Sequence, residues 1–346
     1  MSPEENKNIS EINKVLSAKD FSSDQDVRWC PGCGDYSILA QVQRVMPSLN
    51  IPREKIVFVA GIGCSSRFPY YMNTYGFHGI HGRATAIASG LKMARPDLSV
   101  WIATGDGDLL SIGGNHYMHL MRRNVDVNIL LFNNKIYGLT KGQYSPTSEH
   151  GKITKSTPMG AIDHPVYPVS LSLGANGTFV ARTIDREPKH MQEIILRGSR
   201  HKGTSFIEIY QNCNIFNDGA YDNLTEKDTK ADNVLVLEHG KPLVFGKEND
   251  KGIKLDGFKP IVISLNDGKY SINDVLVHDE KSRELAFILS ELTEYKGFPT
   301  PIGVFLDIER STYETEMAQQ IETSIAKNGK GDLEKLLYSG NTWNIN

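Results

Sequence analysis

Short runs of apolar residues alternate with helical patterns along the first two thirds of the chain. The runs Lys55–Ala60, Ser99–Thr104 and Asp126–Phe132 are rich in β-branched residues, and each one ends at a glycine or an asparagine, which is typical of buried strands. Between them, Arg83–Ala94 and Leu110–Arg123 carry apolar residues at helical spacing. Strands and helices that alternate in this way predict an α/β fold with a doubly wound, mostly parallel sheet.

The same pattern continues with strands predicted at Thr178–Ala181 and Thr204–Tyr210 and a helix between them near Pro188–Gly198. Polar and glycine-rich segments follow the predicted strands, with the sequences GIGCSS, GDGD, NNKIYGLTKGQ and QNC. Ligands of doubly wound sheets bind at the carboxyl ends of the strands. We therefore expect the functional site to be built from these segments.

The character of the chain changes near Thr225. A charged, glycine-containing segment precedes a strand predicted at Pro260–Leu265, a helix at Lys281–Tyr295, a strand at Ile302–Leu306 and a C-terminal helical stretch. We expect three parts: a mobile N-terminal tail (1–25), an α/β domain that carries the chemistry (26–224), and a C-terminal extension that makes subunit contacts (225–346).

Composition narrows the class of protein. Of the 346 residues, 39% are hydrophobic and 23% charged, which is ordinary for a soluble globular protein, and a net charge of −3 gives no indication of nucleic acid or a membrane surface. No apolar run approaches the ~18 residues needed to span a bilayer. The polar, acidic N-terminus lacks the basic start and apolar core of a signal peptide. We therefore expect a cytoplasmic protein that binds neither nucleic acid nor membranes.

A GDG stretch and an Asn-Asn pair stand at the ends of two consecutive predicted strands. Magnesium prefers oxygen ligands in octahedral geometry and usually shares them with substrate phosphates. The carboxylate of Asp106, the amide oxygen of Asn134 and the carbonyl of Ile136 supply three such ligands. Both dipeptides are also common in turns, so on their own they favour two unrelated turns. Their spacing across one strand–helix–strand unit favours a magnesium site that holds a diphosphate.

At this point the chain resembles a known family. GDG followed at this spacing by NN is the thiamine-diphosphate motif, and it stands in order with WCPGCG, GIGCSS, HGRA and YGLTKGQYSPTS. Together these motifs, which cover roughly residues 28–215, resemble the β subunit of 2-oxoacid:ferredoxin oxidoreductases. The resemblance implies a thiamine-diphosphate-binding fold in which Asp106, Asn134 and the Ile136 carbonyl bind magnesium. It also implies contacts with thiamine diphosphate from Ile62, Gly63, Cys64, Ser65, His81, Gly107, Asp108, Gly138 and Leu139.

The four cysteines, Cys30, Cys33, Cys64 and Cys213, match the ligands of one [4Fe-4S] cluster in that family. Thiolates are the usual ligands of such clusters, and structural disulfides are rare in cytosolic proteins. A zinc site and inert buried cysteines are the alternatives. The position of Cys64 inside GIGCSS, beside the predicted cofactor, favours the redox cluster.

Three further residues have two interpretations each. His81 is either a satisfied core histidine or, in its glycine-flanked turn, a phosphate donor. Lys141 is either a surface lysine or a substrate contact. In the family that the chain resembles, pyruvate-selective enzymes tend to have glycine at this position, and lysine accompanies longer or acidic 2-oxoacids. An ammonium group can pair with the distal carboxylate of 2-oxoglutarate, so we expect 2-oxoglutarate as substrate. Arg67 is a second cationic candidate.

The resemblance implies oxidative decarboxylation of 2-oxoglutarate with coenzyme A to succinyl-CoA and CO₂, or the reverse reaction. Electrons leave through the cluster to ferredoxin. We expect no catalytic residue in this chain, because the glutamate that activates the cofactor belongs to the partner α subunit in two-chain members; the expected assembly is α2β2. The alternatives are a β subunit specific for pyruvate or branched-chain 2-oxoacids, a non-oxidative thiamine-diphosphate decarboxylase subunit, and a metal-binding module without activity.

Overall fold

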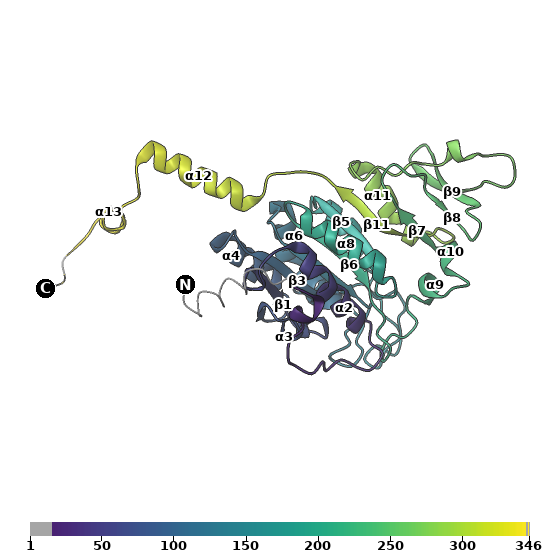
Figure 1. The fold of residues 1–346 in the computed structure, drawn as a ribbon, viewed down its shortest axis with the longest axis horizontal. Coiled ribbons are helices and arrows are strands. Elements are labelled where there is room, and N and C mark those ends of the chain that lie inside the picture. The colour runs from purple at the N-terminus through teal and green to yellow at the C-terminus, as the bar shows by residue number, and fades with distance from the viewer. Residues whose placement is uncertain (1–15, 344, 346) are drawn as a thin grey trace, which may run out of the picture.

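Eight strands form the main sheet in the order β2-β1-β3-β4-β6-β5-β11-β7, in a computed structural model that describes residues 16–343 and 345 (Figure 1). Their bounds are β1 Ile56–Ala60, β2 Tyr75–His78, β3 Ser99–Gly105, β4 Asn128–Asn133, β5 Phe179–Ile184, β6 Ser205–Tyr210, β7 Val234–Leu237 and β11 Thr300–Asp307. The first six strands run parallel, β11 is antiparallel to β5, and β7 is parallel to β11. The predicted α/β fold with a mostly parallel sheet is confirmed.

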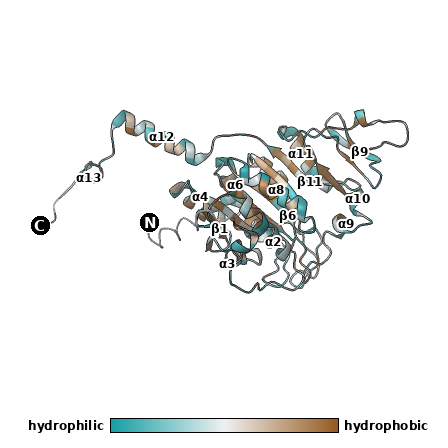
Figure 2. Cartoon of the chain, viewed as in Figure 1, coloured by the Kyte–Doolittle hydropathy of each residue, from teal (hydrophilic) through white to brown (hydrophobic). Residues whose placement is uncertain are grey.

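Helices cover both faces of this sheet. The strands between them are therefore buried, which accounts for their apolar sequences. The main ones are α2 Asp35–Val45, α4 Ala84–Ala94, α5 Asp106–Leu110, α6 Gly114–Arg123, α7 Pro168–Gly174, α8 Pro188–Arg200 and α11 Arg283–Glu291. In β1, Val57 and Val59 pack with α4 and α6, whereas Ile56 and Phe58 pack with α2 and α8. A strand that is buried on both faces needs apolar residues at nearly every position, as in β1, and Figure 2 shows much of the sheet interior in brown, the hydrophobic colour.

The predicted C-terminal extension completes the main sheet, because β7 and β11 both belong to it. It also forms a small antiparallel sheet from β8 Val244–Phe245, β9 Lys251–Asp256 and β10 Lys259–Ser264. The core of the α/β domain therefore extends past the predicted boundary at 224. That residues 225–346 make subunit contacts stays a prediction.

The structure describes only the second part of the predicted N-terminal tail (1–25). Residues 1–15 of the predicted tail lie outside the described residues. Residues 16–25 pack against the domain, because Phe21 in the 3-10 turn η1 Ala18–Phe21 is completely buried. The side chains of Arg53 and Asn73 donate to the Asp20 carbonyl at 2.9 and 3.0 Å. These contacts hold the end of the predicted tail against the domain, and the mobility of residues 1–25 stays a prediction.

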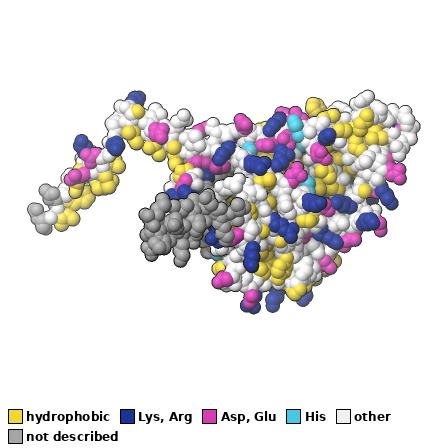
Figure 3. Space-filling model, in the orientation of Figure 1, with side chains coloured by type: hydrophobic (Ala, Val, Ile, Leu, Met, Phe, Trp, Pro, Cys, Tyr) yellow, Lys and Arg dark blue, Asp and Glu magenta, His cyan; other side chains and the backbone are white. Residues whose placement is uncertain are grey.

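An arm leaves the body after β11. It contains α12 Tyr313–Asn328 and α13 Leu333–Leu337 and extends away from the sheet in Figure 1. Ile321 and Leu336 are among its exposed apolar side chains, and Figure 3 shows hydrophobic side chains along the arm. None of the helices in the described ranges is long and apolar enough to cross a membrane.

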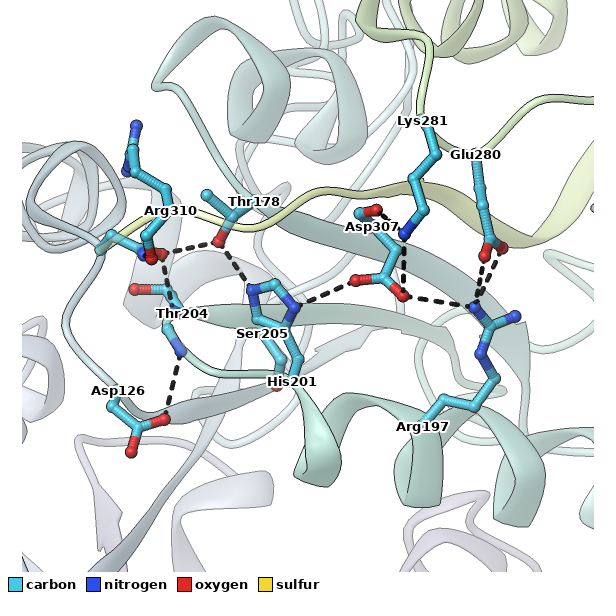
Figure 4. Close-up of polar contacts among 12 residues, drawn as sticks. Asp126, Thr178, Arg197, His201, Thr204, Ser205, Glu280, Lys281, Asp307 and Arg310 are labelled. Carbon is cyan, nitrogen blue, oxygen red and sulfur yellow. Dashed lines mark hydrogen bonds and ion pairs between the residues drawn. The ribbon is translucent and has the colours of Figure 1, made fainter. Parts of the chain in front are cut away.

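A cluster of polar side chains connects the end of β11 to the α/β domain through hydrogen bonds and ion pairs (Figure 4). The His201 ring binds Asp307 Oδ1 through Nδ1 at 3.1 Å and Thr178 Oγ1 through Nε2 at 2.8 Å. Beside it, Arg197 pairs with Glu280 at 2.9 Å. These side chains come from α8, β11 and the loops before β5 and α11, so the cluster holds the start of the arm against the domain.

A buried ion pair crosses the middle of the sheet. Arg182 on β5 donates from Nε to Oε2 of Glu208 on β6 at 2.7 Å, and both side chains are almost completely buried. The other oxygen of Glu208 accepts from Asn133 Nδ2 at 2.7 Å. The pair therefore connects the sheet interior to the Asn-Asn turn.

Replacing Arg182 with methionine is expected to destabilise the protein by about 3–5 kcal/mol, because it leaves the Glu208 carboxylate buried without its counterion. The double variant Arg182→Met with Glu208→Gln recovers much of this loss. Arg186→Met is the control, because its pair with Glu226 is more than half exposed and is expected to contribute below about 1 kcal/mol. Denaturant unfolding measures all three variants, and an Arg182→Met loss as small as that of the control contradicts the prediction.

Candidate active site

A cavity of about 580 Å³ opens at the carboxyl ends of β1, β3 and β4. It is lined by all twelve residues predicted to bind magnesium or thiamine diphosphate: Ile62, Gly63, Cys64, Ser65, His81, Asp106, Gly107, Asp108, Asn134, Ile136, Gly138 and Leu139. Their individual roles as ligands stay predictions. The sheet topology brings the loops together, since β1 and β4 both pair with β3.

Asp106 is the first residue of α5, and its side chain is buried at the edge of the cavity. The hydroxyls of Ser145 and Thr147 donate to its Oδ2 at 2.5 and 2.6 Å. Burial raises the pKa of this carboxyl to about 6, although the two hydroxyls and nearby backbone amides lower it. A divalent cation would compensate this desolvated negative charge, which fits the predicted magnesium ligand.

The two asparagines at the end of β4 differ in their surroundings. Asn133 is buried, and its Oδ1 accepts from Thr147 Oγ1 at 2.9 Å. Asn134 lines the cavity, and its Nδ2 donates to Gln211 Oε1 at 2.8 Å. Lys135 then adopts a left-handed conformation, with φ of 55°, and the chain turns so that Ile136 also lines the cavity. Asn133 therefore supports the turn, and Asn134 faces the ligand space.

Asp108 is tied to the protein on several sides. Its Oδ1 accepts from the backbone amides of Ile62 and Gly82 at 3.0 and 2.8 Å. The same oxygen binds His81 Nδ1 at 2.7 Å, and Oδ2 accepts from Thr104 Oγ1 at 2.9 Å. Asp108 thus joins three strand-end loops, and its bond to Nδ1 leaves Nε2 of His81 available for a ligand.

Two further features fit a bound diphosphate. Ser65 Oγ is buried, lines the cavity, and has no hydrogen-bond partner among the described residues, so a ligand oxygen can satisfy it. Gly107 packs tightly against Tyr137: a Cβ at this position would lie 2.1 Å from the ring, and Tyr137 donates to the Gly107 carbonyl at 3.0 Å. Only glycine therefore lets this backbone stay close to the cavity.

The four cysteines gather beside the cavity. The Sγ atoms of Cys64 and Cys213 each lie 3.6 Å from the point where a Cβ on Gly138 would stand. Cys33 interacts electrostatically with both, and Cys64 with Cys30. No three His, Cys, Asp or Glu side chains in the described part of the chain are close enough together to hold one metal ion.

Burial separates Cys33 and Cys64 from ordinary surface thiols, whereas Cys30 is exposed. It raises the pKa of Cys33 and of Cys64, and the nearby Asp35 raises both further. The pKa of Asp35 is itself raised to about 7, by burial first and then by Asp185. Thiolates at Cys33 and Cys64 are thus costly in isolation, and bound iron is the kind of partner that stabilises them.

The two predicted substrate residues lie outside the cavity wall. Lys141 is exposed, in a turn whose neighbouring Thr140 and Gln143 do line the cavity, and its φ is 76°. Arg67 lines a second, polar cavity of about 510 Å³ together with Arg28. Lys141 therefore stands at the rim of the candidate site. Arg67 lies beside Cys64 of the cavity wall, and its backbone amide donates to the Cys64 carbonyl at 3.2 Å.

Sequence reasoning missed several residues of the site. Asp35 and Tyr137 line the cavity, while Ser145, Thr147 and Gln211 hold its predicted metal ligands. The two hydroxyls stand in the motif YSPTS that carried part of the resemblance, so their position was signalled and their role was not. Asp35 follows the CxxC motif as the first residue of α2, where an acidic side chain is also common for helix capping.

Comparisons with known proteins agree with this geometry. A family model described as the C-terminal TPP-binding domain of thiamine pyrophosphate enzymes matches residues 61–209. The 2-oxoglutarate oxidoreductase subunit KorB of Mycobacterium tuberculosis is 49% identical over 98% of this chain and 91% of its own length. Subunit beta of the 2-oxoacid:ferredoxin oxidoreductase 1 of Aeropyrum pernix is 38% identical over 84% of this chain and 81% of its own length.

A solved structure agrees as well. The 2-oxoglutarate:ferredoxin oxidoreductase from Magnetococcus marinus, with 2-oxoglutarate, coenzyme A and succinyl-CoA bound, matches with a TM-score of 0.75 and 32% identity, over 95% of this chain and 97% of that one. The fold and its cavity place the α/β domain among thiamine pyrophosphate enzymes. The chain belongs to the family of 2-oxoacid:ferredoxin oxidoreductase β subunits.

Proposed function

We propose that this chain is the β subunit of a 2-oxoglutarate:ferredoxin oxidoreductase, which converts 2-oxoglutarate and coenzyme A to succinyl-CoA and CO₂. The observation that carries the proposal is a cavity lined by the thiamine-diphosphate motif and by Cys64, with Cys213 beside it at Gly138. A metal-binding module without activity is set aside, since the family consists of enzymes. A non-oxidative decarboxylase needs no cluster, so it leaves the four cysteines unexplained.

In this proposal the chain holds the cofactor through its strand-end loops. Asp106, Asn134 and the Ile136 carbonyl bind magnesium, and Ser65 and His81 face the diphosphate. Thiamine diphosphate, when bound, supplies a nucleophilic carbon and an electron sink for loss of CO₂. Gly107 lets the backbone approach the ligand space closely.

The cysteines give the reaction its oxidative outcome. Cys30, Cys33, Cys64 and Cys213 would hold a [4Fe-4S] cluster, which would supply one-electron transfer to ferredoxin. Cys64 also lines the cofactor cavity. The two predicted sites therefore share Cys64.

A partner subunit completes the site. The described residues that line the cavity include no glutamate, and their carboxylates, Asp35, Asp106 and Asp108, are buried. The glutamate that activates the cofactor then comes from an α subunit, and the assembly is α2β2. The absence of an α subunit should leave the chain inactive, with the cavity open to water.

Substrate choice is tested at Lys141. Replacing it with glycine is expected to lower kcat/KM for 2-oxoglutarate by roughly 10- to 100-fold, the effect of losing ~1.5–3 kcal/mol from a hydrogen bond to a charged group. Turnover of pyruvate, which has no distal carboxylate, should change little. Glycine fits this backbone, because φ of 76° lies in the left-handed region.

The assay uses the chain assembled with its partner subunit, and compares 2-oxoglutarate, pyruvate and a branched-chain 2-oxoacid. Arg67→Met is the comparison variant, because Arg67 is the second cationic candidate and lies at another cavity. A preference of the wild type for pyruvate, or an equal loss on all three substrates in Lys141→Gly, contradicts the assignment of Lys141.

A further inference from the structure

We propose that Gln211 is a positioning residue shared by the two cofactor sites: one side-chain amide orients the magnesium ligand Asn134 and donates a hydrogen bond to the cluster ligand Cys33. This inference rests on the proposed function, because it needs both cofactors to be bound where that proposal places them. It adds a physical connection between the two sites.

The position of Gln211 is fixed by the sheet. It follows β6 directly, its side chain is 1% exposed, and its backbone amide donates to the Asn133 carbonyl at 3.0 Å. The side-chain Nε2 donates to the Asn212 carbonyl at 2.7 Å and to Cys33 Sγ at 3.3 Å. Its Oε1 accepts from Asn134 Nδ2 at 2.8 Å. The buried amide thus has partners on both sides.

These partners determine which way each amide points. A carbonyl oxygen only accepts, so the Asn212 carbonyl requires the nitrogen of Gln211 on its side. The oxygen of Gln211 must then face Asn134, and Asn134 must present its nitrogen to it. Asn134 Oδ1 is left on the other side of the amide, which is the atom that a magnesium ion needs. Gln211 therefore holds Asn134 in its metal-binding orientation from the nitrogen side, while the Ile136 backbone amide donates to Asn134 Oδ1 at 3.2 Å on the other side.

The same nitrogen acts on the cluster side. Hydrogen bonds to cluster sulfurs stabilise the more negative, reduced state and so raise the reduction potential. Cys33 is half-buried, so few water molecules reach its sulfur. A donor at 3.3 Å is then a substantial part of its surroundings.

Two variants separate the two roles. Gln211→Met has a similar length and removes both the donor and the acceptor. Gln211→Glu keeps an oxygen that accepts from Asn134 Nδ2 and removes the donor to Cys33. Gln41→Met is the matched control: Gln41 is also buried, and its amide binds the Ser37 carbonyl and Gln192, away from the cavity and the cysteines.

The chain is tested in complex with its partner subunit, purified without oxygen. The first measurement is the magnesium concentration that supports half-maximal binding of thiamine diphosphate. The second is the midpoint potential of the cluster bound by this chain, from a redox titration followed by electron paramagnetic resonance. Neither readout depends on turnover.

We expect Gln211→Met to require roughly 10- to 100-fold more magnesium, the usual cost of removing a group that orients a metal ligand. In both Gln211 variants the ratio of reduced to oxidised cluster at a fixed potential should fall on the order of tenfold, which is 59 mV for one electron. Gln211→Glu should keep a magnesium requirement close to that of the wild type, and Gln41→Met should match the wild type in both measurements.

Two kinds of failure are distinguishable. A wild-type complex that binds no thiamine diphosphate, or has no cluster in this chain, refutes the proposed function itself. A wild-type complex with both cofactors, and Gln211 variants with unchanged magnesium requirement and unchanged potential, refutes the role of Gln211 alone. Equal shifts in Gln41→Met also refute it. If Gln211→Met does not fold, an unchanged potential in Gln211→Glu is sufficient to reject the inference.

Discussion

Replacing Asp106 with asparagine is expected to abolish magnesium-dependent binding of thiamine diphosphate and, at the same time, to stabilise the cofactor-free protein above pH 6. The carboxylate is buried with two hydroxyl donors, and its burial raises the pKa to about 6 from an ordinary value of 3.8. An amide of the same shape keeps oxygen in the site and removes the negative charge that the metal needs. We expect the affinity for the cofactor to fall on the order of 100-fold or more.

The stability change has a defined pH window. A carboxyl whose pKa is higher in the folded state favours folding fully below pH 3.8, and this contribution is lost as the pH rises through about 6. The charged form therefore costs the cofactor-free protein about 3 kcal/mol at pH 8, since each pKa unit corresponds to ~1.36 kcal/mol. Asp106→Asn has no such cost, so its melting temperature at pH 8 should be higher by on the order of 5 °C.

Thermal unfolding without cofactor, at several values between pH 3.5 and pH 8, measures this difference. The wild type and Asp106→Asn should converge below about pH 4, their difference should grow as the pH rises toward 6, and it should stay constant above that. Asp163→Asn is the control, because Asp163 is exposed. If Asp106→Asn binds thiamine diphosphate with magnesium as the wild type does, Asp106 is not the metal ligand.

The second large effect is expected at Cys213. Replacing this buried cysteine with serine should remove the cluster and lower substrate-dependent reduction of a viologen dye by on the order of 100-fold or more, because four thiolates are needed to hold it. Magnesium-dependent binding of thiamine diphosphate should remain, since Cys213 does not line the cavity. Cys64→Ser should impair both dye reduction and binding of thiamine diphosphate, because Cys64 does line the cavity.

Iron and acid-labile sulfide, measured after anaerobic purification, report the cluster, and a binding titration reports the cofactor. A Cys213→Ser protein that keeps four iron atoms per chain and full dye reduction contradicts the ligand assignment. One zinc ion per chain in the wild type, in place of iron, favours the structural alternative.

The strands that position the site could be predicted from the sequence because they are buried on both faces. β1, β3 and β4 are buried on both faces, so their apolar runs stand out from the sequence. β2 is exposed throughout and has no such signal. β11 was predicted as a strand, but its place was not: it pairs with β5, which is more than a hundred residues earlier, and local patterns do not encode such pairing.

The residues of the candidate site also fall into two groups, those that short motifs select and those that depend on contacts distant in sequence. Asp106, Asn134 and the cysteines belong to short motifs, so residue type and spacing were sufficient to select them. The functions of Asp108 and Gln211 depend on hydrogen bonds to residues that are distant in sequence, such as Ile62 and Cys33. Such contacts exist only once the sheet has brought the strand ends together.

The most direct test of the account is an anaerobic assay of the chain, alone and assembled with its partner α subunit, for reduction of a viologen dye. The account predicts turnover that requires 2-oxoglutarate, coenzyme A and both subunits, with a clear preference over pyruvate. Robust turnover by the chain alone, or an assembled enzyme that prefers pyruvate, would contradict it.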